Sequence, residues 1–86
     1  MKFERNLYTR ILEITEDYLG PASKRFIDRQ IINHLDKQPE DIGYKDLKSL
    51  VEWVGAATAL LTEDKELVEE FTGRLKSLTN KQPSRG

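Results

Sequence analysis

Few side chains in this sequence have the chemistry of a catalytic or metal-binding group. The 86 residues include no cysteine and one histidine, His34. A metal site or an acid–base pair would need this imidazole to meet carboxylates such as Asp36 or Glu40, because one ligand does not define a site. A histidine in the last turn of a helix, where the dipole favours positive charge, is the simpler interpretation. The sequence also lacks phosphate-loop, serine-hydrolase and zinc-peptidase motifs. We therefore predict no catalytic, cofactor-binding or metal-binding residues, and a protein that is not an enzyme.

Paired acidic residues recur along the chain and raise the alternative of a carboxylate metal centre. These pairs are Glu16-Asp17, Glu40-Asp41, Glu63-Asp64 and Glu69-Glu70. None of them has the Glu-x-x-His spacing with which helical bundles hold metal pairs. Most pairs fall on polar faces or at helix starts, which favours a solvated surface.

A small basic cluster is the main candidate for binding an anionic partner. Lys24, Arg25 and Arg29 fall on one flank of a predicted helix, where they would meet phosphate or an acidic protein. Asp28 interrupts the cluster, and no helix-turn-helix pattern follows it. The formal charge of −1 also removes the long-range attraction on which nucleic-acid binding relies. These points count against nucleic-acid binding, so a nucleic-acid-binding regulatory protein is our alternative prediction and not the leading one.

The run Gly55-Ala56-Ala57-Thr58-Ala59 consists entirely of small residues and predicts a close helix contact. Either a neighbouring helix of the same domain packs there, or Gly55, Ala56 and Ala59 form a self-association surface. Trp53 lies about one turn earlier. It is either part of the core or a partly exposed interface anchor.

The spacing of apolar residues predicts four amphipathic helices. The first covers Phe3–Leu19 and ends at Gly20-Pro21, since Gly favours the left-handed position after a helix and Pro restricts its neighbour. The second covers Pro21 to about Lys37, and a polar loop over 36–43 follows. The third covers Tyr44–Leu61, and the fourth follows Thr62, which we expect to cap it, and ends near Leu78.

The predicted inward face of the third helix is broad, and the fourth helix contains a glycine. The inward residues are Leu47, Leu50, Val51, Val54, Ala57 and Leu61, with Trp53, Ala56 and Leu60 extending that face. Gly73 lies in the middle of the fourth helix, where glycine is unfavourable. Either a neighbouring element approaches closely at Gly73, or this glycine has no structural role.

These elements predict an all-α fold, a compact four-helix bundle of two antiparallel helical hairpins. We expect a single bundle domain over 1–78 and a flexible polar tail over 79–86. No apolar run approaches the ~20 residues needed to span a bilayer, and the N-terminus lacks the apolar stretch of a signal peptide. A cytoplasmic protein without a membrane partner is the expectation.

The segment from Tyr18 to Ile27, with its Leu19-Gly20-Pro21 turn, and the later segment Asp46–Leu50 carry a family resemblance. They resemble a small helical module at the C-terminal ends of bacterial signalling proteins of the Ser/Thr kinase-like and response-regulator-like kinds. The resemblance covers about half the chain. It implies an accessory or regulatory interaction domain and no catalytic residues.

Taken together, these observations predict a non-enzymatic protein–protein interaction module or regulatory adaptor in prokaryotic signalling. Its partner would be another protein or a second copy of the same chain.

Overall fold

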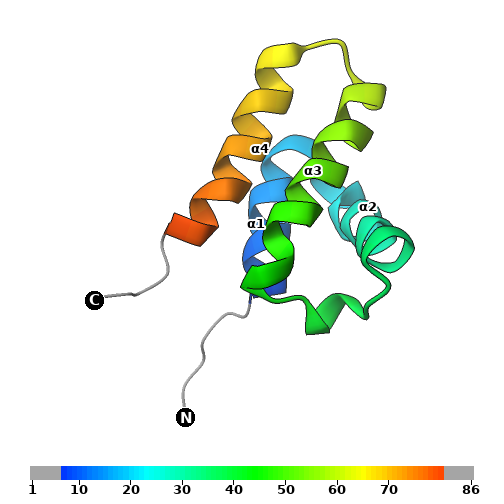
Figure 1. The fold of residues 1–86 in the computed structure, drawn as a ribbon. Coiled ribbons are helices and arrows are strands. Elements are labelled where there is room, and N and C mark those ends of the chain that lie inside the picture. Colours follow the sequence, from blue (N-terminus) through cyan, green and yellow to red (C-terminus); the bar gives the residue numbers. More distant parts are fainter. Residues whose placement is uncertain (1–6, 81–86) are drawn as a thin grey trace.

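The computed structural model describes residues 7–80, and every regular element in that range is helical. This confirms the all-α class. Three helices are long: α1 (Leu7–Leu19) has 13 residues, α3 (Tyr44–Leu61) has 18 and α4 (Lys65–Asn80) has 16. The remaining helix, α2 (Ser23–Gln30), has only eight. In Figure 1, α3 and α4 form an antiparallel hairpin, α1 lies behind it, and α2 lies at the side.

The corner between α1 and α2 forms where the Gly-Pro pair predicts it. α1 ends at Leu19, and Gly20 adopts a left-handed conformation with φ of 59°. A short 3-10 turn over Gly20–Ala22 carries Pro21 in its first turn. The Ser23 hydroxyl donates a hydrogen bond to the Gly20 carbonyl at 2.6 Å, which ties the start of α2 to the corner.

The second helix differs from its predicted range of Pro21 to about Lys37. It is regular only over Ser23–Gln30 and then widens into a π-helical turn over Ile31–Leu35. This turn ends because Asp36 takes a left-handed conformation with φ of 56°. Sequence periodicity did not reveal the widening.

The predicted loop over 36–43 contains one short 3-10 turn, Pro39–Asp41, and is anchored at both ends. Ile42 is buried in the core. The Lys37 ammonium contacts the Asp46 carboxylate at 2.6 Å, and the same Asp46 oxygen accepts a hydrogen bond from the Gly43 N–H at 3.0 Å. This capping arrangement starts α3 at Tyr44, as predicted.

The start and end of α4 correct the sequence prediction in detail. The capping side chain of α4 is Asp64, whose Oδ1 accepts a hydrogen bond from the Leu67 N–H at 3.1 Å. Thr62, the expected cap, instead accepts from the Asp64 N–H at 3.0 Å. α4 continues to Asn80 rather than ending near Leu78, so the first two positions of the expected polar tail are helical. The rest of that tail, 81–86, and the predicted start of the first helix at Phe3 lie outside the described residues.

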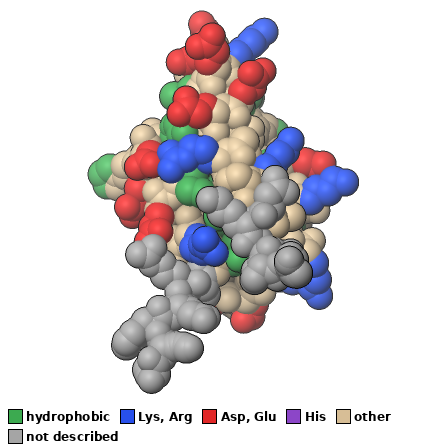
Figure 2. Space-filling view, turned by 90° about the vertical axis from the view of Figure 1, so that its left-hand side faces the viewer, with side chains coloured by type: hydrophobic (Ala, Val, Ile, Leu, Met, Phe, Trp, Pro, Cys, Tyr) green, Lys and Arg blue, Asp and Glu red, His purple; other side chains and the backbone are tan. Residues whose placement is uncertain are grey.

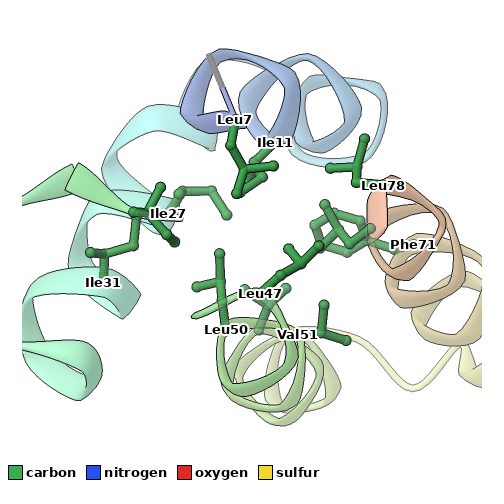
Figure 3. Close-up of a cluster of buried hydrophobic side chains, with 12 residues drawn as sticks. Leu7, Ile11, Ile27, Ile31, Leu47, Leu50, Val51, Phe71 and Leu78 are labelled. Carbon is green, nitrogen blue, oxygen red and sulfur yellow. The ribbon is translucent and has the colours of Figure 1, made fainter. Parts of the chain in front are cut away.

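All four helices contribute to one apolar core, which Figure 3 shows in cross-section. Side chains from α1 and from α2 with its π turn converge on those from α3 and α4. The buried set is Leu7, Ile11, Ile27, Ile31, Ile42, Leu47, Leu50, Val51, Val54, Phe71, Leu75 and Leu78.

The end of the α3–α4 hairpin projects beyond the other helices, and this overturns part of the predicted core. At 1.5 Å per residue, the 18 residues of α3 span about 27 Å and the 13 described residues of α1 about 20 Å. Of the residues predicted to face inward, Leu60 and Leu61 are therefore exposed, at 88% and 63%. Trp53 and Ala56 are exposed for another reason, because they lie off the face of α3 on which Val51, Val54 and Thr58 are buried. The helices around the core are too short to cover the last turns of α3.

The two glycines of this hairpin occupy different environments. A Cβ on Gly55 would lie 3.2 Å from Cγ2 of Thr72, so α3 and α4 approach closely at this point. A Cβ on Gly73 would meet nothing within 4 Å, so no neighbouring element approaches there. The run of small residues thus packs against its own domain at Gly55, while Gly73 has no such contact.

Candidate interaction surface

The structure places the seven predicted interaction residues on two separate surfaces. Trp53, Gly55, Ala56 and Ala59 belong to α3, and Lys24, Arg25 and Arg29 belong to α2. Of the α3 residues, Gly55 faces α4 and is only partly exposed, whereas Trp53, Ala56 and Ala59 are exposed. The surface on α3 is therefore set by Trp53 and its exposed neighbours.

The π turn positions the only histidine against the only tryptophan. The rings of His34 and Trp53 stack with centroids 3.8 Å apart and planes 4° from parallel. Trp53 retains 42% exposure despite this contact. The indole is thus held on one side by an imidazole and still presents apolar area to solvent, as interface anchors do.

We name the exposed apolar residues of α3, Trp53, Ala56 and Leu60, the α3 strip. They lie at positions i, i+3 and i+7, which places them on one face of the helix. Ala59 is exposed beside them. A contiguous exposed apolar face of this kind is typical of a surface that contacts another protein.

The second surface is a shallow groove on the outer side of α2, which we name the α2 groove. It combines apolar with cationic side chains. Its apolar part includes Ile32, which is 52% exposed. The residues that form its floor and rim include Leu19, Pro21, Lys24, Arg25, Arg29 and Ile32.

The three cations of the α2 groove are not equivalent. Lys24 is paired with Asp28 at 2.8 Å, and this carboxylate also accepts a hydrogen bond from the Tyr8 hydroxyl. Burial, followed by the hydrogen bond to Asp28, raises the pKa of Tyr8. Arg25 and Arg29 form no ion pair within residues 7–80, and they lie one turn apart, where like charges repel. The unneutralised positive charge of the groove therefore resides on the two arginines.

A third feature, the hairpin tip over residues 60–66, combines apolar with acidic side chains. Leu60, where the α3 strip ends, and Leu61 are the two most exposed large apolar residues of the described chain. Glu63, Asp64 and Glu66 are all exposed beyond them. Lys65 is exposed among them, and Figure 2 shows both acidic and basic side chains at this end of the molecule, with the acidic ones predominating.

The side chains that a metal site would need do not come together in the described part of the chain. Among residues 7–80, no cluster of three or more His, Asp and Glu side chains is arranged to hold a metal ion. His34 contacts the Trp53 ring. No described helix combines the length and apolarity required to cross a bilayer.

Sequence reasoning missed two features of these surfaces. The His34–Trp53 stack joins residues 19 positions apart through a π turn that has no periodic signal. The exposed tip leucines continue the inward pattern of α3 and differ from core residues only in lacking a helix opposite them. Comparisons of the chain with protein-family models, with curated proteins and with solved structures gave no match.

Proposed function

We propose that this chain is a non-enzymatic protein–protein interaction module, with the α3 strip as its principal contact surface. The observation that carries the proposal is the exposure of Trp53 and Leu60, at 42% and 88%. Burial of apolar area contributes roughly 25 cal/mol per Å², so covering these side chains with a partner is favourable. A regulatory role in prokaryotic signalling is the part of the proposal that the Leu-Gly-Pro resemblance supports.

The His34–Trp53 contact supports the same proposal because it limits the motion of the indole. An anchor that is already ordered loses less conformational entropy on binding than a mobile side chain. The scaffold that we propose for this surface is a four-helix bundle, with α2 and the turn Ile31–Leu35 together acting as its fourth, short helix.

Nucleic-acid binding receives less support from the same structure. Lys24 is already paired with Asp28, so two cations of α2 remain without an ion pair to any described residue. Binding to a phosphate backbone gains most of its affinity from the number of phosphates that are neutralised. Two arginines beside an exposed isoleucine fit a protein surface better than a phosphate backbone.

Site-specific photo-crosslinking in cells of the native host tests the proposal. A photoreactive side chain at Ala56 is expected to trap a defined protein, which is then purified for binding measurements. The matched control carries the same group at Glu16, an exposed position of α1. Trp53→Ala is expected to weaken binding of the purified partner by about tenfold or more, the scale of an anchor residue. Equal trapping at both positions, or unchanged binding by the Trp53 variant, would reject the α3 strip.

A further inference from the structure

We propose that the α2 groove binds the hairpin tip of a second copy of this chain. This deepens the proposed function, on which it rests, by assigning an occupant to a second surface. The two surfaces are complementary in apolar character and in charge. The groove offers apolar area and unpaired arginines, and the tip offers apolar area and carboxylates.

On the groove side, the arginines have an electrostatic reason to bind an anionic group. Arg25 and Arg29 are exposed, lie one turn apart and form no ion pair within the described residues. Like charges at this spacing destabilise a helix by a few tenths of a kcal/mol, and a carboxylate placed between them removes that repulsion. Ile32, one turn further on, provides the apolar contact.

On the tip side, the apolar and acidic residues are adjacent in sequence. Leu60 and Leu61 close α3, and Glu63 and Glu66 follow within the next turn of chain. Asp64 is partly engaged in capping α4. Two exposed leucines followed by carboxylates match an apolar groove that is edged by arginines.

The observations favour this occupant over a nucleic acid. A phosphate backbone would leave Ile32 uncovered, although this side chain lines the groove and is 52% exposed. A segment that carries leucines as well as carboxylates can contact both the apolar part and the cationic part of the groove.

Groove and tip are different surfaces, so the contact is heterologous. In Figure 1, the tip lies at the top of the hairpin and α2 lies at the side. Each added copy leaves one groove and one tip free, and association therefore extends beyond two copies unless the arrangement closes into a ring. A contact this small falls at the low end of specific interfaces, so we expect weak association that salt opposes.

Two variants, each blocking one half of the contact, test the proposal by sedimentation velocity. The groove variant carries Arg25→Glu with Arg29→Glu, and the tip variant carries Leu61→Gln with Glu63→Lys. Trp53, Ala56 and the α4 cap Asp64 stay intact in both. Matched controls are Lys48→Glu with Lys76→Glu, and Glu16→Lys, all at exposed positions. Circular dichroism and thermal unfolding establish that every variant is folded.

The wild-type chain and the controls are expected to gain average mass with concentration up to the millimolar range. This gain should be lost when the ionic strength rises from about 0.1 M to about 1 M, where the screening length falls to about 3 Å. Each blocking variant should stay monomeric, with association weakened by about tenfold or more. An equimolar mixture of the two variants should form a one-to-one dimer and nothing larger, because it restores one intact groove and one intact tip.

Four results would overturn this assignment. The first is a wild-type chain that stays monomeric at millimolar concentration and low salt. The second is a mixture of the two variants that remains monomeric. The third is salt-dependent retention on DNA or RNA that Arg25→Glu with Arg29→Glu abolishes, with no self-association. The fourth is association that Trp53→Ala removes and that the groove and tip variants leave unchanged. This result would reject the groove but keep the α3 strip.

Discussion

Nζ of Lys37 lies 2.6 Å from Oδ2 of Asp46, and this contact fastens the loop after the π turn to the first turn of α3. The same carboxylate accepts the Gly43 N–H at 3.0 Å. Both groups are mostly buried, with side-chain exposures of 30% for Lys37 and 16% for Asp46. The contact thus joins the segment that carries His34 to the helix that carries Trp53.

Removal of the Asp46 side chain is expected to destabilise the domain. Asp46→Ala loses the cap on the Gly43 amide and leaves Lys37 without its partner, at a cost of about 1 to 2 kcal/mol in the free energy of unfolding. Urea unfolding followed by circular dichroism measures the change. The control is Asp17→Asn, which breaks the exposed Asp17–Arg74 pair and should cost about 0.5 kcal/mol or less. Equal costs for the two variants would show that Asp46 has no special role.

The contribution of Asp46 should also depend on pH. The hydrogen bond from the Lys37 ammonium, assisted by the Gly43 N–H and opposed by burial, holds the pKa of Asp46 below its usual value. A lowered pKa in the folded state means that this stabilisation is fully present above the unfolded pKa of about 3.9 and is lost as the pH falls through the lowered value. The stability difference between the wild type and Asp46→Asn should therefore be constant near neutral pH and shrink in acid. A difference that grows in acid would contradict this sign.

Thr58→Val is expected to stabilise the protein. Thr58 is 1% exposed, and its hydroxyl has no hydrogen-bond partner among residues 7–80. An unpaired buried polar group costs about 1 to 3 kcal/mol, and valine has nearly the same shape. We expect a gain of about 1 kcal/mol in the free energy of unfolding. The matched control is Thr15→Val, because the buried Thr15 hydroxyl already donates to the Ile11 carbonyl at 2.8 Å. A gain at position 15 that equals the gain at position 58 would argue against this explanation.

Alanine at the two helical glycines should have different effects. Gly73→Ala adds a Cβ into open space and removes the unfavourable helix propensity of glycine, for a gain of up to about 1 kcal/mol. Gly55→Ala places its Cβ 3.2 Å from Cγ2 of Thr72, so crowding between α3 and α4 offsets that gain. Thermal unfolding should rank Gly73→Ala above the wild type and above Gly55→Ala. A more stable Gly55→Ala than Gly73→Ala would contradict the close approach of α3 and α4 at Gly55.

His34→Ala is expected to uncover the indole of Trp53 with little effect on stability. The chain has one tryptophan, so intrinsic fluorescence reports only this site. Loss of the stacked imidazole should increase quenching by acrylamide, since one face of the ring becomes accessible. Asn33→Ala, at the exposed position just before it, is the control and should leave quenching unchanged. Unaltered quenching in the His34 variant would mean that the stack does not persist in solution.

Much of the fold was predictable from sequence because local signals set its boundaries. Gly20 and Pro21 end α1 where their backbone preferences require, and α3 has its predicted bounds of Tyr44–Leu61. Apolar spacing also identified most of the buried residues. These signals act within a few residues, so a single sequence contains them.

The predictions that failed concern burial, which depends on how neighbouring helices are placed beside one another. Leu61 continues the inward pattern of α3, yet it is 63% exposed because the neighbouring helices end before it. Trp53 lies beside the buried face of α3, and among the described residues only the imidazole of His34 stacks on its ring. The seven predicted interaction residues also fell on two surfaces, since spacing along a helix does not state which neighbour covers it. Relative helix length and offset are properties of the assembled fold.

The π-helical turn over Ile31–Leu35 accommodates one residue more than an α-helical turn. That extra residue rotates everything beyond it by about 100° relative to a continuous α-helix. Through this change of phase, Ile31 stays in the core and Leu35 packs against it, while His34 reaches the indole. A regular α-helix over the same residues would turn Leu35 and His34 away from these partners, whereas deleting the exposed Asn33 would remove the extra residue and return both side chains close to their present faces.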